Sequence, residues 1–494
     1  MSRYAFYFDA SGCSGCKACQ VACKDRNGLE VGLLWRRVYE VSGGSWERQE
    51  DAWLPQVYAY NLSVACNHCE RAVCVEACPT KAIYQRQDGI VLIDAERCIG
   101  CKYCSWACPY GAPQYDSRAK SMTKCTFCVE DVEAGLAPAC VAACPLRVLD
   151  FGEKTELEQG EAVRSAPPLP AAEMTEPAMF IQPHRDSGRV QEPLGRVANR
   201  EEVQIGKKTS ELPLMVFTVL VQMAVGAFII LGAFTAWVIG NTRLDYVRPL
   251  TVIPLLITGL ALGLGVLASL LHLGHPLRAC RAILHLRTSW LSREILLVVS
   301  FGAGWAVFYG LVLVFPAFTR LLWGIYGLAA LVGLALIFCM ARVYHLQSMS
   351  TWNSPMTTAT FYLTAGLLGV LFSAVLLAPH IGPDLILFLQ ISGRPHPIFY
   401  SKTAVGLLMV VGLLMLAFDL ALQDRHENSK GKGFWLTQLR LALSVAAMLP
   451  LGIVLAGAST GTIPSLIVLA FGLALGAQLI GRWQFYERLN EREL

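Results

Sequence analysis

Long, uninterrupted apolar stretches fill the second half of this chain and are missing from the first half. From residue 213 onward, apolar runs of 18 or more residues recur between short polar interruptions. Each run is long enough to cross about 30 Å of hydrocarbon as an α-helix. An even number of crossings would bring both ends of the bundle to the same side of the membrane. The pattern predicts eight membrane helices, at about 213–239, 250–271, 294–316, 321–341, 358–378, 402–422, 437–458 and 463–481.

The composition of the 494 residues agrees with a chain of two physically different parts. Hydrophobic residues make up 54% and charged residues 16%, with a formal net charge of +4, and the charged residues concentrate in the first 210 positions. The first part is therefore predicted to fold in water against one membrane face. We expect a cysteine-rich domain at 1–152, an extended linker or wrap-around segment at 153–210, and an all-α polytopic membrane bundle at 211–494.

Sixteen of the 18 cysteines lie before residue 145, in four sets of four. Sets one and three have the spacing Cys-x2-Cys-x2-Cys-x3-Cys of bacterial two-cluster ferredoxins, in which the fourth thiolate binds the other cluster. We therefore predict an α+β, duplicated ferredoxin-like domain that holds four [4Fe-4S] clusters, with each set needing another set. The sets are Cys13, Cys16, Cys19, Cys23; Cys66, Cys69, Cys74, Cys78; Cys98, Cys101, Cys104, Cys108; and Cys125, Cys128, Cys140, Cys144.

Two other interpretations of the cysteines are less favourable. Zinc also binds paired Cys-x2-Cys elements, but it would leave the third and fourth cysteines of a set crowded. Disulfides are disfavoured because no signal peptide precedes the cysteines and each set is too tightly spaced for unstrained bridges. The remaining two cysteines, Cys280 and Cys339, stand in apolar surroundings and are predicted to be buried core thiols.

Both halves resemble one family. The stretch Cys98-Ile-Gly-Cys-Lys-Tyr-Cys-Ser-Trp-Ala-Cys-Pro-Tyr-Gly-Ala-Pro-Gln114 resembles the four-cluster electron-transfer subunit of molybdenum oxidoreductases of the dimethyl sulfoxide reductase family. The second half is similar to the eight-helix anchor subunit of that family. These subunits are usually separate proteins, so the chain resembles their natural fusion. The matching stretches of the second half are Pro213-Leu-Met-Val-Phe-Thr218, Leu271-His-Leu-Gly-His-Pro-Leu-Arg278, Ser292-Arg-Glu-Ile295 and Ala341-Arg-Val-Tyr344.

The resemblance implies which cysteines share a cluster, because in the family set one exchanges a ligand with set four, and set two with set three. This chain keeps every cysteine of set three, so four four-iron clusters are expected. The implied ligands are Cys13, Cys16, Cys19 and Cys144 for cluster 1; Cys66, Cys69, Cys74 and Cys108 for cluster 2; Cys98, Cys101, Cys104 and Cys78 for cluster 3; and Cys125, Cys128, Cys140 and Cys23 for cluster 4.

The resemblance also implies the partners. Electrons would pass between a molybdopterin-containing catalytic subunit, which is a separate chain, and menaquinone or ubiquinone bound in the anchor. This chain itself would hold no site that converts the substrate of the complex. We expect a lipid bilayer and no nucleic acid among the other partners.

Three polar residues near the ends of the second and third apolar runs are candidates for the quinone site. His272, Arg278 and Glu294 lie on one face of the membrane, where ionisable groups near hydrocarbon are costly and tend to be functional. A histidine and a carboxylate can supply the protons that quinone chemistry needs. The alternative is that all three only snorkel to the interface. Arg342 and Arg482, at predicted helix ends, are expected to bind lipid headgroups.

The loop charges predict that the cysteine-rich domain faces the cytoplasm of a bacterial or archaeal cell, because short loops rich in Lys and Arg stay inside. The absence of an export signal at the start of the chain favours the same side. The face shared with the first domain carries Lys207, Lys208, Arg278, Arg281, Arg287, Arg293, Arg342, Arg425, Lys430, Lys432, Arg440, Arg482, Arg488 and Arg492, against Arg243, Arg248, Arg320, Arg394 and Lys402 opposite.

A cytoplasmic cluster domain favours the sulfite dehydrogenases of the same molybdenum family, in which sulfite oxidation would reduce quinone. The alternative within the family is an anaerobic respiratory reductase of dimethyl sulfoxide or a related oxide, with electrons flowing the opposite way. An alternative of another class is a redox-driven ion pump or transporter. It is disfavoured because the helices lack an evident chain of buried carboxylates or paired broken segments.

Overall fold

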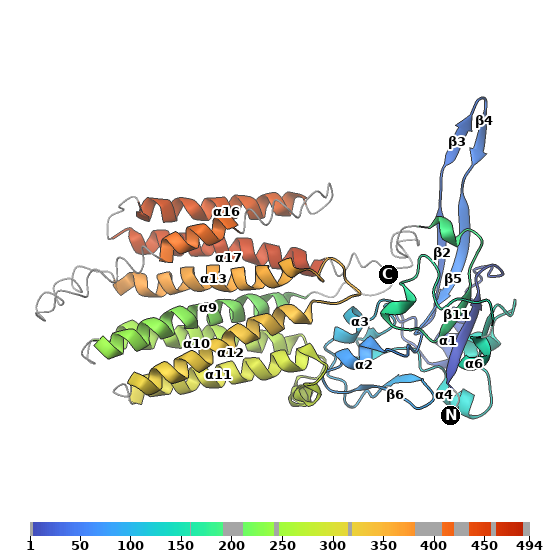
Figure 1. Cartoon of the computed structure of the whole chain (residues 1–494), viewed down its shortest axis with the longest axis horizontal. Coiled ribbons are helices and arrows are strands. Elements are labelled where there is room, and N and C mark those ends of the chain that lie inside the picture. The colour runs from blue at the N-terminus through green and yellow to red at the C-terminus, as the bar shows by residue number, and fades with distance from the viewer. Residues whose placement is uncertain are drawn as a thin grey trace, which may run out of the picture.

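The structure is a computed structural model that describes residues 3–158, 160–190, 211–241, 247–314, 319–380, 408–418, 434–455 and 461–487. A bundle of long helices forms one end of the molecule, and a smaller domain of short strands and helices sits against one end of that bundle (Figure 1). This is the predicted two-part architecture.

The smaller domain, here called the cluster domain, is organised around a three-stranded sheet. Strand β1 (Tyr4–Asp9) lies in its centre, pairs antiparallel with β10 (Leu149–Glu153) and pairs parallel with β11 (Met179–Gln182). Two short hairpins, β6–β7 (Ile83–Gln85 and Val91–Ile93) and β8–β9 (Gln114–Asp116 and Ser121–Thr123), follow the second and third cysteine sets. The short helices are α1 (Ala18–Arg26), α2 (Val73–Ala77), α3 (Tyr103–Ala107), α4 (Val129–Glu133), α5 (Ala139–Ala142) and α6 (Lys154–Leu157).

The segment after β10 returns to the cluster domain. Phe180 and Ile181 of β11 are buried, and β11 completes the central sheet. Glu70 and Arg71, which lie between Cys69 and Cys74 of the second set, donate backbone hydrogen bonds to the carbonyls of Glu176 and Thr175. Residues 163–190 thus wrap over the domain, and residues 191–210 lie outside the described part.

A long antiparallel ribbon leaves the cluster domain. It is formed by β2 (Arg37–Gly43) and β5 (Tyr58–Val64), which pair along their whole length. The ribbon continues into a second hairpin, β3 (Trp46–Gln49) and β4 (Ala52–Pro55), which projects away from the body of the molecule (Figure 1).

Among the described residues, seven helices are long and apolar enough to cross a membrane. Their ends agree with the predicted apolar runs to within about four residues, except at the C-terminal end of the last run, where the helix continues six residues further. The helices are α9 (Leu212–Asn241), α10 (Val247–Leu271), α11 (Trp290–Val314), α12 (Thr319–Val343), α13 (Pro355–Leu377), α16 (Phe434–Leu455) and α17 (Ile463–Glu487).

Chain direction requires one more crossing between α13 and α16. Helix α13 begins beside the cluster domain and therefore ends on the far side. Helix α16 begins on the near side again, because the Gln484 side chain near the end of α17 donates to the hydroxyl of Thr437. The apolar helix Leu408–Phe418 lies inside the run predicted at 402–422, whose remaining residues are not described. The anchor is therefore a bundle of about eight helices.

Helix α9 is the centre of the bundle. It packs against α10, α12, α13 and α17, and 72% of its most apolar window is buried, against 22–39% for α10, α11, α12, α16 and α17. Gly226 of α9 faces Ala365 and Gly369 of α13, so closely that a Cβ atom at residue 226 would overlap the Ala365 carbonyl. Small residues thus let these two backbones meet, as is common between membrane helices.

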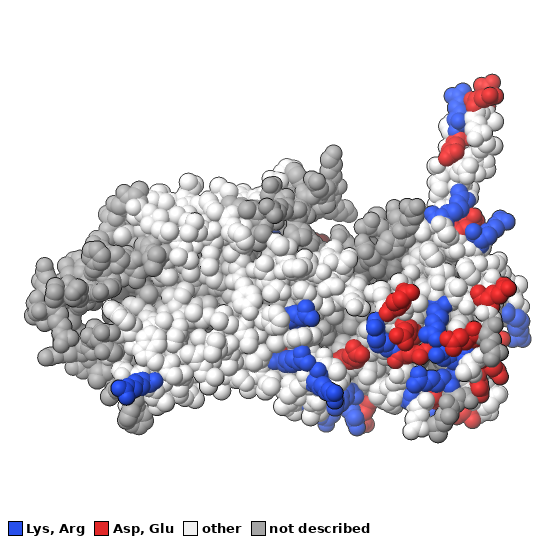
Figure 2. Space-filling model, in the orientation of Figure 1, with Lys and Arg blue, Asp and Glu red and all other residues white. Residues whose placement is uncertain are grey.

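The charges follow the same division. Figure 2 shows acidic and basic residues gathered over the cluster domain and its junction with the bundle, while the flank of the bundle is almost free of them. A belt without charge is what a helix bundle surrounded by hydrocarbon requires.

Candidate functional site

The first and third cysteine sets fold into the same turn. Gly15 and Gly100 have φ of 70° and 69°, and Lys17 and Lys102 both have φ of 60°. These left-handed conformations curl the backbone around the sulfur atoms, and glycine adopts them without strain. The N–H groups of Gly100 and Met122 each donate to the Cys98 sulfur over 3.4 Å. Such N–H to sulfur bonds are one of the means by which a protein tunes a bound cluster.

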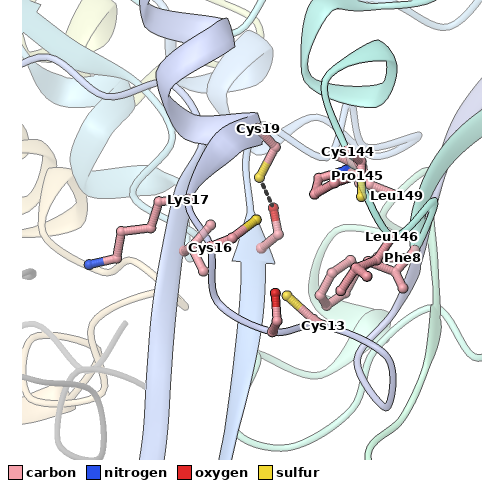
Figure 3. Close-up of a pocket in the computed structure, with 13 residues that line it drawn as sticks. Phe8, Cys13, Cys16, Lys17, Cys19, Cys144, Pro145, Leu146 and Leu149 are labelled. Carbon is pink, nitrogen blue, oxygen red and sulfur yellow. Dashed lines mark hydrogen bonds between the residues drawn. The ribbon is translucent and has the colours of Figure 1, made fainter.

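One pocket gathers four thiols from the two ends of the cysteine-rich sequence. Figure 3 shows Cys13, Cys16 and Cys19 on one side and Cys144 on the other, with apolar side chains such as Phe8 between them. The hydroxyl of Ser63 lies 3.5 Å from the Cys19 sulfur. Cys16 is exposed, so this pocket, the first chamber, opens to solvent.

A second pocket, the second chamber, is lined by Cys66, Cys69, Cys74 and Cys108. Its wall includes Tyr110 and the buried side chain of Lys124, which donates to the Val91 and Cys125 carbonyls. A lysine held inside the domain provides positive charge beside a site for anionic thiolates.

The other eight cysteines of the four sets form two further groups. In the third chamber, Cys104 interacts electrostatically with Cys78, Cys98 and Cys101. In the fourth chamber, Cys23 interacts in this way with Cys128 and Cys140, and Cys125 with Cys23 and Cys140. These neighbours are compatible with the ligand groups that the resemblance implies, which stay a prediction.

The thiols fit a multi-iron cofactor. Burial raises the pKa of Cys23 and Cys101 to about 12, so that without a metal these thiols would stay protonated at neutral pH. Iron ligands are thiolates, and bound metal supplies the positive charge that such buried thiolates need. All 18 cysteines are free of disulfides. A single zinc would need ligands converging at about 2.3 Å, and no three His, Cys, Asp or Glu among the described residues converge in this way.

The chambers follow one another in space. Cys19 of the first chamber interacts electrostatically with Cys140 of the fourth. Cys125 of the fourth interacts with Cys66 of the second, and Cys104 of the third with Cys74 of the second. The series therefore runs first, fourth, second, third, from the solvent-exposed edge at Cys16 to the side that faces the bundle.

The third chamber meets the bundle at His272, which directly follows α10. Its Nε2 lies 3.2 Å from the Cys101 carbonyl oxygen, and its Nδ1 lies 3.0 Å from a carboxylate oxygen of Glu211. The other Glu211 oxygen lies 3.8 Å from the Lys102 ammonium. The His272 and Glu211 side chains are only 4% and 5% exposed, so an ion-paired group lies buried between the cluster domain and the membrane helices.

Comparison with known proteins agrees with both halves of this architecture. Residues 205–487 match the family described as DMSO reductase anchor subunit (DmsC), and residues 57–154 match the 4Fe-4S dicluster domain. The chain belongs to the DmsC family. The match covers the bundle from just before α9 to the end of α17, and the iron–sulfur domain is joined in front of it.

The relatives of the first half are subunits of redox complexes. The probable anaerobic dimethyl sulfoxide reductase chain YnfG of Escherichia coli is 45% identical over 203 residues, which are 41% of this chain and 99% of the relative. A chain of the anaerobic dimethyl sulfoxide reductase of the same organism is 44% identical over the same shares. One subunit of the sulfite dehydrogenase of Allochromatium vinosum is 38% identical over 31% of this chain and 70% of the relative. The chain is thus an iron–sulfur electron-transfer subunit fused to its DmsC membrane anchor.

Within the DmsC region, the three predicted quinone-site residues do not form one cluster of contacts. Glu294 of α11 is buried, and its carboxyl lies near Tyr103 of the cluster domain, whose pKa is raised by burial and then by Glu294. The Tyr103 hydroxyl donates to the Val343 carbonyl over 2.7 Å. Arg278 instead donates to the Ala95 and Cys98 carbonyls and so binds the cluster domain itself.

Two other expectations for the DmsC region are wrong. Arg482 does not reach lipid headgroups: it is 6% exposed, donates to the Gln222 side-chain oxygen over 3.1 Å and lies over the Phe361 ring. The apolar run ends at residue 481, so Arg482 was expected at a helix end. Helix α17 instead continues to Glu487, which places Arg482 inside the helix. Cys280 is exposed, whereas Cys339 is buried as expected, because residues 276–285 form a short 3-10 helix on the outside of the junction.

Sequence reasoning also missed Glu211, Lys102 and Trp106 as residues of the junction. The Trp106 ring lies 6.3 Å from His272, and stacks on Tyr344. The position of Glu211 directly before the first apolar run could have marked it as a junction residue. Its partner His272, however, lies 61 positions further along the chain. Nothing local in the sequence connects them.

Proposed function

We propose that this chain carries electrons between a separate molybdenum-containing catalytic subunit and membrane quinone, through four [4Fe-4S] clusters. The observation that supports this most is the series of neighbouring thiol chambers, which begins at an exposed edge and ends against the helix bundle. Bound clusters would supply single-electron transfer along that series. Of the sixteen thiols, only Cys16 of the first chamber is exposed.

At the inner end, His272 and Glu294 are the groups that would exchange protons with a quinone bound nearby. Two electrons reach a quinone together with two protons, so a site needs groups that can hold a proton and release it. Glu211 holds the imidazole of His272 against the Cys101 carbonyl, beside the innermost chamber. Glu294 is a carboxyl buried among apolar helices, which is costly unless it serves a function.

The experiment measures how fast added quinol reduces the clusters in membranes that contain the complex. Replacing His272 by Ala, or Glu294 by Gln, should slow cluster reduction about 100-fold, the scale of one lost acid–base group. His275→Ala is the matched control, because its ring hydrogen-bonds the Ala119 carbonyl at the same junction and is more exposed than His272. Wild-type rates in both variants, with iron content intact, would show that quinone does not react here.

We propose that the cluster domain faces the cytoplasm. Arg278 and Arg281 both bind carbonyls of the cluster domain, so these basic residues lie on its side of the membrane. With the buried Arg482 left out, the sequence still has 13 basic residues on the cluster face against 5 on the opposite face. A phosphatase fused to the C-terminus should be inactive, since that enzyme works only outside the cytoplasm. Activity there would reverse the assignment.

We propose two substrate classes for the partner subunit, each favoured by one observation. The higher identity to dimethyl sulfoxide reductase chains favours reduction of an S-oxide or similar oxide by quinol. The basic cluster face favours sulfite oxidation coupled to quinone reduction, and a sulfite dehydrogenase subunit of Allochromatium vinosum is among the relatives. Sulfite-dependent quinone reduction and quinol-dependent dimethyl sulfoxide reduction, compared in membranes with and without the gene, separate the two.

A further inference from the structure

The β3–β4 hairpin is the most exposed regular structure of the cluster domain. All eight residues of its two strands are exposed, including the large side chains of Trp46, Trp53 and Leu54. It projects sideways from the end of the molecule remote from the helices (Figure 1). An isolated two-stranded hairpin is only marginally stable in water. Exposed tryptophans on such a hairpin therefore indicate a surface that a partner covers.

The strand register sorts the hairpin into two faces. Trp46 is opposite Pro55 and Arg48 is opposite Trp53, so alternation puts these four side chains on one face. Trp46 and Trp53 are therefore diagonal neighbours, 59% and 62% exposed. We call Trp46, Trp53 and Pro55 the tryptophan face. Tryptophan and arginine are the side chains most often found as binding hot spots.

The ribbon that carries the hairpin also lines the first chamber. Ser63 of β5 contacts the Cys19 sulfur, and the Asn61 side chain of β5 donates to the Cys13 carbonyl over 3.4 Å. The backbone N–H of Val38 in β2 donates to Gln20 of α1 over 3.0 Å. From Gly43 to Gln49 the strand extends about 20 Å beyond this contact region at 3.3 Å per residue. We call the β3–β4 hairpin and the ribbon that carries it the arm, which thus starts beside the first chamber and its exposed edge at Cys16.

We propose that the tryptophan face is a docking surface for the catalytic subunit. The arm would contact the side of that subunit, and the same subunit would cover the exposed edge of the first chamber. This inference rests on the proposed function, which requires a redox protein at that edge. The arm would fix the orientation of the partner, and the two tryptophans would insert into an apolar cleft on it. Aromatic anchors with a charged rim are the usual anatomy of such interfaces.

Charge argues against a lipid surface as the occupant. The hairpin and its turn carry Glu47, Glu50 and Asp51 against Arg48, a net charge of −2 from one basic and three acidic residues. Anionic headgroups would repel this tip. The arm also starts from the part of the domain opposite the junction with the bundle.

The test uses the full complex, purified in detergent through a tag on this chain, and measures molybdenum per iron. After washing, the molybdenum-to-iron ratio of the W46S/W53S variant should be at least tenfold lower than that of the wild type. Its iron content should stay at about sixteen atoms per chain. The matched control is A52S/L54S, which removes apolar groups from the opposite face of the same hairpin and should retain the wild-type ratio. Wild-type molybdenum content in W46S/W53S overturns the docking surface but leaves the proposed function standing.

Two further outcomes distinguish the alternatives. A wild-type preparation without molybdenum would count against the proposed function itself. Two copies of this chain in the wild-type complex and one in W46S/W53S, with molybdenum unchanged, would show that the face joins copies of this chain and overturn the inference. A photo-crosslinking residue in place of Trp53 provides a measurement that does not depend on stability. Its covalent product should be the molybdenum subunit, and a crosslink only to a second copy would contradict the proposal.

Discussion

At the scale of single residues, the inner end of the molecule depends on a few buried charges. Glu211 stands between His272 and Lys102, and the side chains of all three are mostly buried. A carboxylate in such a place fixes the orientation of the imidazole that it contacts. Removing one member leaves the other charges without compensation in a site of low polarity.

Glu211→Gln should therefore impair the junction without touching a predicted cluster ligand. We expect quinol-dependent cluster reduction to fall about tenfold, because the His272 ring loses the partner that orients it. Iron content should stay at the wild-type value, which metal analysis checks. Glu30→Gln, which removes an exposed ion pair with Arg118, is the control and should have no effect. An unchanged rate in the Glu211 variant would contradict a positioning role.

Cys101→Ser tests the assignment of the third chamber. The variant should lose one cluster, which lowers iron from about sixteen to about twelve atoms per chain and removes one paramagnetic signal. Cys280→Ser is the matched control, because Cys280 is exposed and lies outside the chambers. All four signals in the Cys101 variant would disprove the ligand assignment.

At the scale of elements, the contact between α9 and α13 determines how tightly the bundle closes. Gly226 and Gly369 remove two side chains from the crossing, so that backbone meets backbone. Close packing of this kind replaces the hydrophobic effect as the source of stability inside a membrane.

Gly226→Ala should lower the free energy of unfolding of the bundle by about 2 kcal/mol, because the added methyl would overlap the Ala365 carbonyl and push α13 away. Thermal unfolding in detergent measures this change. Gly263→Ala in α10 is the control, since a Cβ there meets no atom within 4 Å, and it should alter stability by less than about 0.5 kcal/mol. Equal melting temperatures of the two variants would show that α9 and α13 can move apart without loss of stability.

At the scale of the whole molecule, the two halves depend on different sources of stability. In the cluster domain the buried core around the third chamber includes four of the thiols themselves, Cys74, Cys78, Cys98 and Cys104, with few apolar neighbours. The bundle has extensive apolar contacts of its own. The central sheet of the first half has an apolar core of its own, but Cys23, Cys140 and Cys144 form part of it, so we expect cofactor binding to add to the folding energy of that half.

Iron removal should unfold one half and spare the other. After oxidative loss of the clusters, we expect backbone amides between residues 3 and 190 to exchange rapidly with deuterium, while α9 to α13 stay protected. Hydrogen exchange read by mass spectrometry gives both values in one sample. Full protection of β1, β10 and β11 without iron would show that the domain folds on its own apolar core.

The parts of this architecture that sequence could predict are those encoded locally. Apolar length placed α9 at 213–239 where the helix is 212–241, and cysteine spacing selected the thiols that line the chambers. Contacts between distant segments could not be read in this way. The four residues of β11 carry no long periodicity, and Glu211, Arg482 and the tryptophan face acquire meaning only from their neighbours in space.

The junction between the halves has a consequence for how such fusions can diversify. The segment from His272 to Ser292 grips the cluster domain through main-chain carbonyls, among them those of Cys78, Cys98 and Cys101. Carbonyls belong to every residue type, so this segment recognises the path of the iron–sulfur loops, whereas side-chain recognition is left to Lys102, Tyr103 and Trp106. Outside those three positions, an anchor of this design accepts sequence drift in the facing loops for as long as the cysteine spacing preserves that path.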